Sequence, residues 1–406
     1  MYGIGRQLWG DGFIPRMNGR SRPGIMRAMA PSDLFTDEIS AIPAIIVDAR
    51  LALEDRDISA ELRDRDIAMI TDTQAWRYSD PRTWETEWNS VPYAPSSPFS
   101  ARRDWVRDYV LKDLSAQVDT GCTCLILPGW FPSLETMELA RTVALWTLEA
   151  FDEFKPKAAV SPTIAWIAAR PGARDASLAA AKVYAESGVV HAAYVQRDKI
   201  NCPRDSLDRL KRSAKLMLEI QNLGLPVIAG YFGCMGLTIR AIGVSAADCG
   251  PCEGQSFDFL EAITAALPRP MEGASSRRGH PPVRMWLEEL GQTLTAQQME
   301  AIRQNRIAFA EIMCRRACHR FRLGRDTMSV AVHHSLLSLC EAATRQARLP
   351  ASMRVDNARR LLTEMKVRIA TMDSVLQAEK QRPLRREHLD VQLALLADAN
   401  SLHGVA

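Results

Sequence analysis

Long hydrophobic runs are absent from this 406-residue sequence, in which no apolar stretch reaches the ~18 residues that a membrane-spanning helix needs. The basic N-terminal segment also lacks the apolar centre of a secretory signal peptide. A surplus of one charge is absent too, because 51 Lys and Arg stand against 48 Asp and Glu. We therefore expect a cytoplasmic protein without membrane contacts, and total charge alone predicts no class of binding partner.

Two nucleotide-binding motifs are missing as well. No G-x-G-x-x-G follows the first apolar run, and no G-x-x-x-x-G-K-[ST] occurs at any position, so nucleotide phosphates are not held in either of these ways. The nine cysteines are odd in number and scattered along a chain with 47% hydrophobic residues. Such a chain is large enough to fold around an apolar core, and we expect its thiols to be reduced rather than paired in disulfides.

Apolar runs alternate with helical patterns over the first 250 residues. The runs, which we expect to be strands, cover 41–51, 67–76, 122–128, 158–169, 189–195, 225–232 and 243–250. Strands that are apolar throughout are typical of parallel sheets covered on both faces, and parallel pairing requires crossover helices. The pattern predicts an α/β fold, a (β/α)8 TIM-like barrel whose eighth strand comes from residues 256–268 or from the N-terminal segment. A Rossmann-type sheet is the alternative.

The composition of the sequence divides the chain into four segments. We expect a basic N-terminal arm (1–40), the TIM-like barrel (41–270), a linker rich in Pro, Gly and Ser (271–284) and an α-helical C-terminal domain (285–406). Thr295 and Gln298 match a capping box at the start of the first C-terminal helix. Residues 271–406 carry 21 basic and 14 acidic side chains, a net charge of +7, which leaves −4 for the rest.

Polar residues that end the apolar runs are the candidates for an active site, because a TIM barrel carries its site at the carboxyl ends of its strands. Asp72 and Asp248 lie in the runs 67–76 and 243–250, where each directly follows the apolar part and has small neighbours. Of two such carboxylates, one can attack an electrophilic carbon while the other, its pKa raised by burial and by its neighbour's charge, moves a proton. The pair predicts displacement at an anomeric carbon. The alternative for each Asp is a structural role, capping a helix or bracing a loop.

Two segments resemble motifs of the tRNA-guanine transglycosylases. Residues 71–76, TDTQAW, are similar to the TDSGGFQ segment of that family, and residues 243–249, GVSAADC, are similar to its GVDMFDC segment. Both lie at the ends of matching barrel strands and in the same order. The resemblance implies that Asp248 is the nucleophile that attacks ribose C1′ and that Asp72 is the general acid and base.

The same resemblance implies residues that surround the exchanged base. Gln196 is similar to the base-reading Gln of the family's VQGG segment, and Gly230 is similar to its base-contacting glycines. Four more substrate-binding candidates lie at strand ends or in the loop after the second strand: Thr73, Trp76, Trp130 and Tyr231. That loop is rich in aromatic residues, which stack on a base or sugar as part of a lid, or else pack the loop upon itself.

The family's zinc quartet, CxCxxC with a following His, is absent from this sequence. The chain therefore resembles a divergent branch, such as the DNA 7-deazaguanine insertion enzymes, more than the tRNA enzymes proper. Cys249 and Cys252 form a lone CxxC, which is either half of a zinc site completed by Cys314, Cys318 and His319 or a pair of buried free thiols. We favour free thiols and expect neither a metal nor another cofactor.

Basic residues gather in the C-terminal segment. Five arginines near one predicted helix end are candidates for nucleic-acid binding: Arg315, Arg316, Arg320, Arg322 and Arg325. Arginine forks match phosphate oxygens, and counterion release drives such association. The alternative is a solvated helix whose C-terminal charges complement the helix dipole. With the basic N-terminal arm, these residues favour DNA or tRNA as a partner, with the target base leaving the stack to reach the barrel.

The sequence thus predicts an enzyme, a base-exchanging glycosyl (ribosyl) transferase of the pentosyltransferase class. It would modify guanine in nucleic acid through a covalent Asp intermediate and take a 7-deazaguanine-type base in exchange. Two alternatives stay open. One is a non-enzymatic barrel that binds a partner protein, in which the two Asp residues are structural. The other is a barrel lyase or hydrolase acting on a small metabolite.

Overall fold

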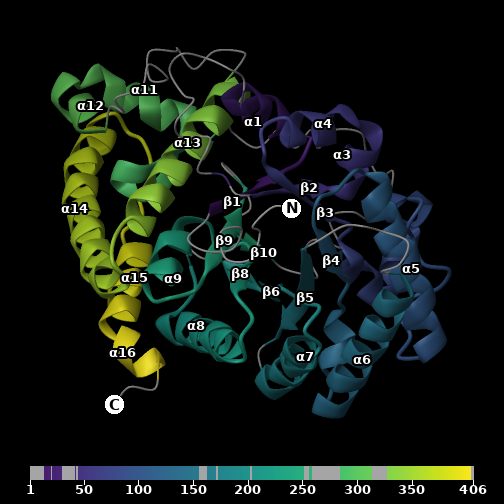
Figure 1. Cartoon of the computed structure of the whole chain (residues 1–406). Helices are drawn as coiled ribbons and strands as arrows, with labels where there is room; N and C mark the ends of the chain where they lie inside the picture. Colours follow the sequence, from purple (N-terminus) through teal and green to yellow (C-terminus); the bar gives the residue numbers. More distant parts are fainter. Residues whose placement is uncertain are drawn as a thin grey trace.

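Eight parallel strands form a nearly closed barrel in the computed structural model of this chain (Figure 1). The structure describes residues 13–19, 21–29, 42, 44–154, 162–170, 172–201, 204–250, 256–257, 284–312 and 327–403. The barrel strands are β1 (Phe13–Met17), β2 (Ala44–Asp48), β3 (Ala68–Asp72), β4 (Leu125–Leu127), β5 (Thr163–Ala169), β6 (Ala192–Arg197), β8 (Val227–Ala229) and β9 (Ala246–Cys249). The predicted TIM-like barrel is confirmed, and the alternative of an open Rossmann-type sheet is wrong.

The strands follow the order β3-β2-β1-β9-β8-β6-β5-β4, and each neighbouring pair is parallel. The two outer strands approach each other where Ile70 of β3 forms a parallel bridge with Cys124. Next to this bridge, the backbone N–H groups of Thr123 and Cys124 donate to the carbonyl of Met69 at 3.0 and 3.2 Å. Every residue of β5 is buried, as expected for a parallel strand covered on both faces.

The eighth strand comes from the N-terminal segment. β1 lies between β2 and β9, so residues of the expected arm complete the barrel. In the other region considered, 256–268, the described residues form the short strand β10 (Ser256–Phe257), which is antiparallel to β7 (Ile200–Asn201). A search for uniformly apolar runs misses β1 because Pro15 and Arg16 interrupt it.

Helices connect the strands on the outside of the barrel (Figure 1). They are α1 (Arg22–Met29), α3 (Ala49–Glu54), α4 (Asp57–Arg63), α5 (Arg103–Asp119), α6 (Met137–Phe154), α7 (Arg174–Glu186), α8 (Leu207–Asn222) and α9 (Gly236–Ala241), with the 3₁₀ helices η4 (Phe131–Leu134) and η6 (Gly233–Met235). The helical patterns in the sequence predict helices at 101–119, 134–154, 175–187 and 204–223, and α5 to α8 begin and end within three residues of these bounds. Within the described part of the chain, no helix combines the length and the apolar character needed to cross a membrane.

The C-terminal segment is helical, but it opens with a hairpin that an all-helical expectation missed. Strands β11 (Arg284–Leu287) and β12 (Gln292–Thr295) pair antiparallel around η7 (Glu288–Leu290). Thr295 and Gln298 form the predicted capping box. The helices that follow are α11 (Ala296–Gln304), α12 (Arg306–Ile312), α13 (Thr327–Ala347), α14 (Ala351–Ala378), α15 (Glu387–Ala397) and α16 (Ala399–Leu402).

The C-terminal helices cover the side of the barrel where its own helices are short. α9 has only six residues, and both α13 and α14 contact it, while α13 also contacts α1 and β1. Figure 1 shows this green-to-yellow group beside α8 and α9, with α5, α6 and α7 on the opposite side. Polar contacts join the two parts: Gln346 Nε2 donates to the carbonyl of Leu237 at 2.7 Å, and Thr238 Oγ1 donates to Gln392 Oε1 at 2.6 Å.

The aromatic loop after β3 packs upon itself and upon α5. It folds into three 3₁₀ helices, η1 (Ala75–Ser79), η2 (Pro81–Glu85) and η3 (Glu87–Ser90). Four of its aromatic side chains are buried: Trp76, Tyr78, Trp88 and Tyr93. Phe99 packs against Trp105 and Trp130 with ring centroids 5.3 and 5.4 Å apart. The loop therefore packs internally, while stacking of its aromatic residues on a base or sugar stays a prediction.

Asp113, which lies fully buried on α5, ties this helix to the barrel. The Tyr109 hydroxyl donates to its Oδ1 at 3.2 Å, Gln117 Nε2 donates to its Oδ2 at 2.7 Å, and Thr73 is a third hydrogen-bond partner. Gln117 also bonds both backbone groups of Ile126 in β4. Burial raises the pKa of Asp113 to about 7, although its three hydrogen bonds oppose the rise.

We expect the stability of the wild-type protein to fall relative to that of Asp113→Asn as pH rises from about 4 to about 7. In an unfolded chain this carboxyl loses its proton near pH 3.9, whereas the folded protein keeps the proton up to about pH 7, so the fall amounts to about 4 kcal/mol at most. Urea unfolding of both proteins at pH 4.5 and pH 8 measures the change. A difference between the two unfolding free energies that does not vary with pH would contradict this assignment.

Candidate active site

Arg16 of β1 joins the two predicted catalytic carboxylates at the carboxyl end of the barrel. Its Nη1 donates to Asp72 Oδ2 at 2.5 Å, and its Nη2 donates to Asp248 Oδ2 at 3.1 Å. The side chains of Arg16, Asp72 and Asp248 are 10, 8 and 0% exposed. Since both carboxylates contact the same guanidinium group, they lie close together at one end of the barrel.

Tyr194 of β6 completes this cluster. Its hydroxyl donates to Asp248 Oδ2 at 2.6 Å and accepts from Arg16 Nη2 at 2.9 Å. Gly230, directly after β8, makes room for it, because a Cβ at this position would lie 2.5 Å from the Tyr194 hydroxyl oxygen. Tyr231 follows with a φ of +62°, a strained conformation for a residue with a side chain, and its ring centroid lies 4.8 Å from the Arg16 guanidinium carbon.

Burial and charge oppose each other in this cluster. Burial raises the pKa of Asp248, while the charge of Arg16 and the hydrogen bonds from Tyr194 and Arg16 lower it, and the net result is a raised pKa. For Arg16, burial lowers the pKa, but the charge of Asp248 and the other acidic groups nearby outweigh burial and keep it well above its ordinary value. Arg16 is therefore a permanent cation beside both carboxylates, and its charge opposes the rise in the pKa of Asp248.

The two carboxylates differ in whether both of their oxygens accept hydrogen bonds. Asp72 Oδ2 accepts from Arg16, and Asp72 Oδ1 accepts from the backbone N–H of Gln74 at 2.8 Å. Asp248 uses Oδ2 for both of its partners, and its Oδ1 is buried without a hydrogen-bond partner among the described residues. Buried polar atoms without a partner are uncommon in folded proteins, and Asp248 Oδ1 is thus a candidate for contact with a ligand.

Gln196 of β6 also has a buried polar atom without a hydrogen-bond partner among the described residues. The indole N–H of Trp166 in β5 donates to Gln196 Oε1 at 2.9 Å, which orients the amide. Gln196 Nε2 is buried and has no hydrogen-bond partner within the described part of the chain. The predicted base-reading residue therefore carries an unused donor.

Gln74 links Asp72 to a third acidic residue. Its Nε2 donates to Asp48 Oδ2 at 2.7 Å, and its Oε1 accepts from Arg77 Nε at 2.7 Å. Gln74 has a φ of +54°, so a second non-glycine residue at the strand ends adopts the left-handed conformation. Asp48 also accepts from the backbone N–H of Arg50 and thereby caps α3, so for this Asp the structural role is the observed one.

The remaining substrate-binding candidates are held within the protein. Thr73 is 2% exposed and hydrogen-bonds Asp113. Trp76 is 2% exposed, and the guanidinium carbon of Arg77 lies 4.6 Å from its ring centroid. Trp130 is 1% exposed in an aromatic cluster with Phe99, Trp105 and Tyr109. These three side chains are buried and make contacts within the protein, and their role in substrate binding stays a prediction.

Several predicted residues lie outside the described part of the chain. These are the five candidates for nucleic-acid binding, Arg315, Arg316, Arg320, Arg322 and Arg325, together with the cysteines and the histidine considered as zinc ligands, Cys252, Cys314, Cys318 and His319. Among the residues that the structure does describe, no three His, Cys, Asp or Glu side chains gather in a way that would hold a metal ion.

A basic cavity of about 130 Å³ lies where β5 and β6 end, between α7 and α8. Six basic residues line it and no acidic residue does: Arg170, Arg174, Arg197, Arg209, Arg212 and Lys215. Ion pairs with acidic residues outside the lining engage the first four. Arg212 and Lys215 are exposed and form no ion pair with a described residue, so this cavity favours an anion.

Sequence reasoning missed Arg16 and assigned no function to Tyr194. Arg16 lies in a five-residue strand within a segment that has no helical or strand period, so its sequence context contains no sign of an active-site residue. Tyr194 precedes Gln196 by two positions in a predicted strand, and side chains two apart in a strand face the same side. That spacing was the available signal.

Comparisons with known proteins add little to this description. No protein-family model matches the chain, and no curated protein matches it. Among solved structures, it is similar to a dihydrodipicolinate synthase from Oceanobacillus iheyensis, with 9% sequence identity, a TM-score of 0.33, and coverage of 97% of this chain and 98% of that chain. A likeness of this size carries no argument about function. The assignment of the barrel rests on its strand pairing.

We expect Arg16→Gln to lower the free energy of unfolding by about 3–5 kcal/mol at pH 7.5, because it leaves two buried carboxylates without their counter-charge. The destabilisation should shrink at acidic pH, where the carboxylates take up protons. Urea unfolding monitored by circular dichroism measures both effects. The matched control is Arg50→Gln, which breaks an exposed ion pair with Glu87 and should cost less than about 1 kcal/mol. Equal destabilisation in the two variants would mean that Arg16 does not hold the cluster together.

Proposed function

We propose that this protein is a base-exchanging glycosyl transferase that modifies guanine in nucleic acid, with Asp248 as its nucleophile. The observation that carries the proposal is the asymmetry of Asp248. Its Oδ2 is anchored by Arg16 and Tyr194, while its buried Oδ1 has no hydrogen-bond partner among the described residues. An oriented carboxylate with one unused oxygen is what attack on an anomeric carbon requires.

The proposed reaction has two displacement steps at the ribose C1′ atom. In the first, Asp248 Oδ1 forms a bond to C1′ as the bond from C1′ to the guanine nitrogen breaks, and the leaving guanine takes a proton from Asp72. In the second, the incoming base gives a proton to Asp72 and attacks C1′, which releases Asp248. The overall exchange conserves protons and needs no oxidant or reductant. The charge of Arg16 lowers the pKa of Asp248 and so opposes the larger effect of burial, which raises it.

Asp72 suits proton transfer better than covalent attack. Both of its oxygens already accept hydrogen bonds, one from Arg16 and one from the backbone of Gln74. These contacts hold the carboxylate in one orientation beside the nucleophile. From that position it can give a proton to the leaving guanine and take one from the incoming base.

Gln196 supports the choice of guanine as the target. Its unused Nε2 is a hydrogen-bond donor fixed by Trp166. Guanine presents two adjacent acceptors, O6 and N7, on the edge that faces the major groove. A buried donor that finds no partner discriminates strongly in favour of a ligand that supplies an acceptor.

The basic cavity between α7 and α8 supports a polymeric anion as the substrate. It lies at the end of β6, the strand that carries Tyr194 and Gln196, and Arg197 of the same strand lines it. Phosphates of the nucleotides next to the target would bind there, while the target base leaves the stack and enters the barrel. A lyase or hydrolase for a small metabolite has no need of this second charged region.

We expect a covalent adduct between the protein and guanine-containing DNA or tRNA when the second base is withheld. Denaturing electrophoresis with labelled nucleic acid detects the adduct, and Asp248→Asn should abolish it because the amide is not a nucleophile of comparable strength. The matched control, Asp57→Asn on the surface helix α4, should form the adduct as the wild type does. Circular dichroism checks that each variant is folded. An adduct that persists in Asp248→Asn, or none from folded wild type with either polymer, would remove the proposal.

We expect nucleic-acid binding to weaken with salt, with a slope that depends on the basic cavity. Replacing Arg212 and Lys215 by Gln should reduce the slope of log K against log salt concentration by about 1 for each phosphate that the variant no longer binds. Fluorescence anisotropy with a labelled oligonucleotide at several salt concentrations measures the slope. The control is the double variant of Arg56 and Arg63 to Gln, which removes two exposed charges from α4 and its N-cap, away from the cavity. Equal slopes in both double variants would show that the cavity does not bind phosphate.

A further inference from the structure

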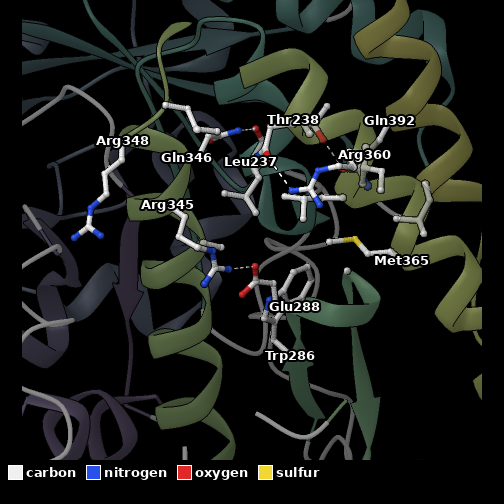
Figure 2. A pocket seen from close by; sticks show the side chains of 18 residues that line it. Leu237, Thr238, Trp286, Glu288, Arg345, Gln346, Arg348, Arg360, Met365 and Gln392 are labelled. Atoms are coloured by element: carbon white, nitrogen blue, oxygen red, sulfur yellow. Dashed lines mark hydrogen bonds and ion pairs between the residues drawn. The ribbon is translucent and has the colours of Figure 1, made fainter. Parts of the chain in front are cut away.

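A second cavity, of about 320 Å³, lies where the C-terminal helices meet the barrel. It is lined by residues of α9 from the barrel, of the β11–β12 hairpin, and of helices α13, α14 and α15 (Figure 2). Binding sites for small molecules occupy cavities of about 300 Å³ and more and often lie between packed units of a protein. Its position on the outside of the barrel separates it from the site around Asp248.

The interior of this cavity is apolar. Half of its eighteen lining residues are hydrophobic, and they come from both the barrel and the C-terminal helices; Leu237, Trp286, Ala358 and Leu389 are examples. Met365 of α14 extends into the same region, and its sulfur lies 2.9 Å from the position that a Cβ on Gly291 would take. Such a lining favours a ligand with a hydrocarbon or aromatic body.

The rim of the cavity carries a positive charge. Three arginines and one glutamate belong to the lining: Arg345, Arg348, Arg360 and Glu288. Glu288 pairs with Arg345, and Arg360 pairs with Glu364 of its own helix. Arg348 is exposed and forms no ion pair with any described residue, and Figure 2 shows its side chain apart from the others. The ligand that complements this rim is an anion.

Two lining side chains also keep polar atoms without a hydrogen-bond partner in the described part of the chain. They are the indole N–H of Trp286 and the Oε1 of Gln346, on residues that are 2 and 5% exposed. The other end of the Gln346 amide is fixed, because its Nε2 donates to the carbonyl of Leu237. A ligand that combines an apolar body with polar atoms fits this lining better than a pure hydrocarbon does.

We propose that this cavity binds a small amphipathic organic anion, a molecule with an apolar body and one carboxylate or sulfonate group. The apolar body lies against Leu237, Trp286 and Ala358, and the anionic group pairs with Arg348 at the rim. Because α9 and the C-terminal helices both line the cavity, the bound molecule strengthens the contact between the barrel and the helical part. This inference does not depend on the proposed transferase activity.

The test uses 8-anilinonaphthalene-1-sulfonate as the probe and decanoate as a competitor, with the full-length protein. We expect one saturable probe site per chain. Decanoate should displace the probe at least tenfold more effectively than decanol, which has the same chain without the charge. More than one equivalent site, or equal displacement by decanoate and decanol, would overturn the proposal.

Three variants locate the site. Ala358→Trp fills the cavity and should abolish saturable binding, and Arg348→Gln should weaken probe binding at least fivefold. Arg141→Gln removes an exposed charge from α6 and should bind as the wild type does. If Ala358→Trp fails to fold, the comparison of Arg348→Gln with Arg141→Gln decides. Wild-type binding by folded Ala358→Trp, or by Arg348→Gln, would place the probe elsewhere and refute the inference.

Discussion

The buried guanidinium group of Arg16 is the interaction on which the site depends. It contacts Asp72 of β3 and Asp248 of β9, two carboxylates that would repel each other and resist burial without a cation between them. Its own strand, β1, lies between β2 and β9, so the residue that neutralises the charges also belongs to the strand that completes the barrel. The same strand therefore completes the barrel and supplies the cation of the carboxylate cluster.

Alternate side chains of β6 take part in two different polar regions at the end of the barrel. In β6, Tyr194 contacts the Asp248 cluster and Gln196 contacts Trp166, whereas Val195 and Arg197 line the basic cavity between α7 and α8. Alternate side chains of a strand point to opposite faces. One short strand thus carries Tyr194 and Gln196 on the face toward the Asp248 cluster and Arg197 on the face that lines the basic cavity.

Packing around the carboxylates limits how the site can change. Gly230 has no side chain because the Tyr194 hydroxyl occupies the space that a Cβ would need. Gln74 and Tyr231 hold left-handed conformations next to the cluster. The aromatic loop after β3, which in other settings would form a mobile lid, is buried against α5. Such an arrangement costs backbone conformational freedom, and it holds the charged groups of the cluster in fixed orientations.

Local patterns in the sequence determined most of the barrel: uniformly apolar runs predicted seven strands, amphipathic spacing predicted α5 to α8, and the ends of the runs identified Asp72, Gln196 and Asp248. Only the tertiary structure decided that Arg16 lies between the two carboxylates, because that contact joins residues 56 and 232 positions apart. The same holds for β1, whose short mixed sequence becomes a strand through pairing with β2 and β9. The periodicity of a sequence indicates which face of a helix or strand is buried. It contains no information about which side chain from a distant part of the sequence packs against that face.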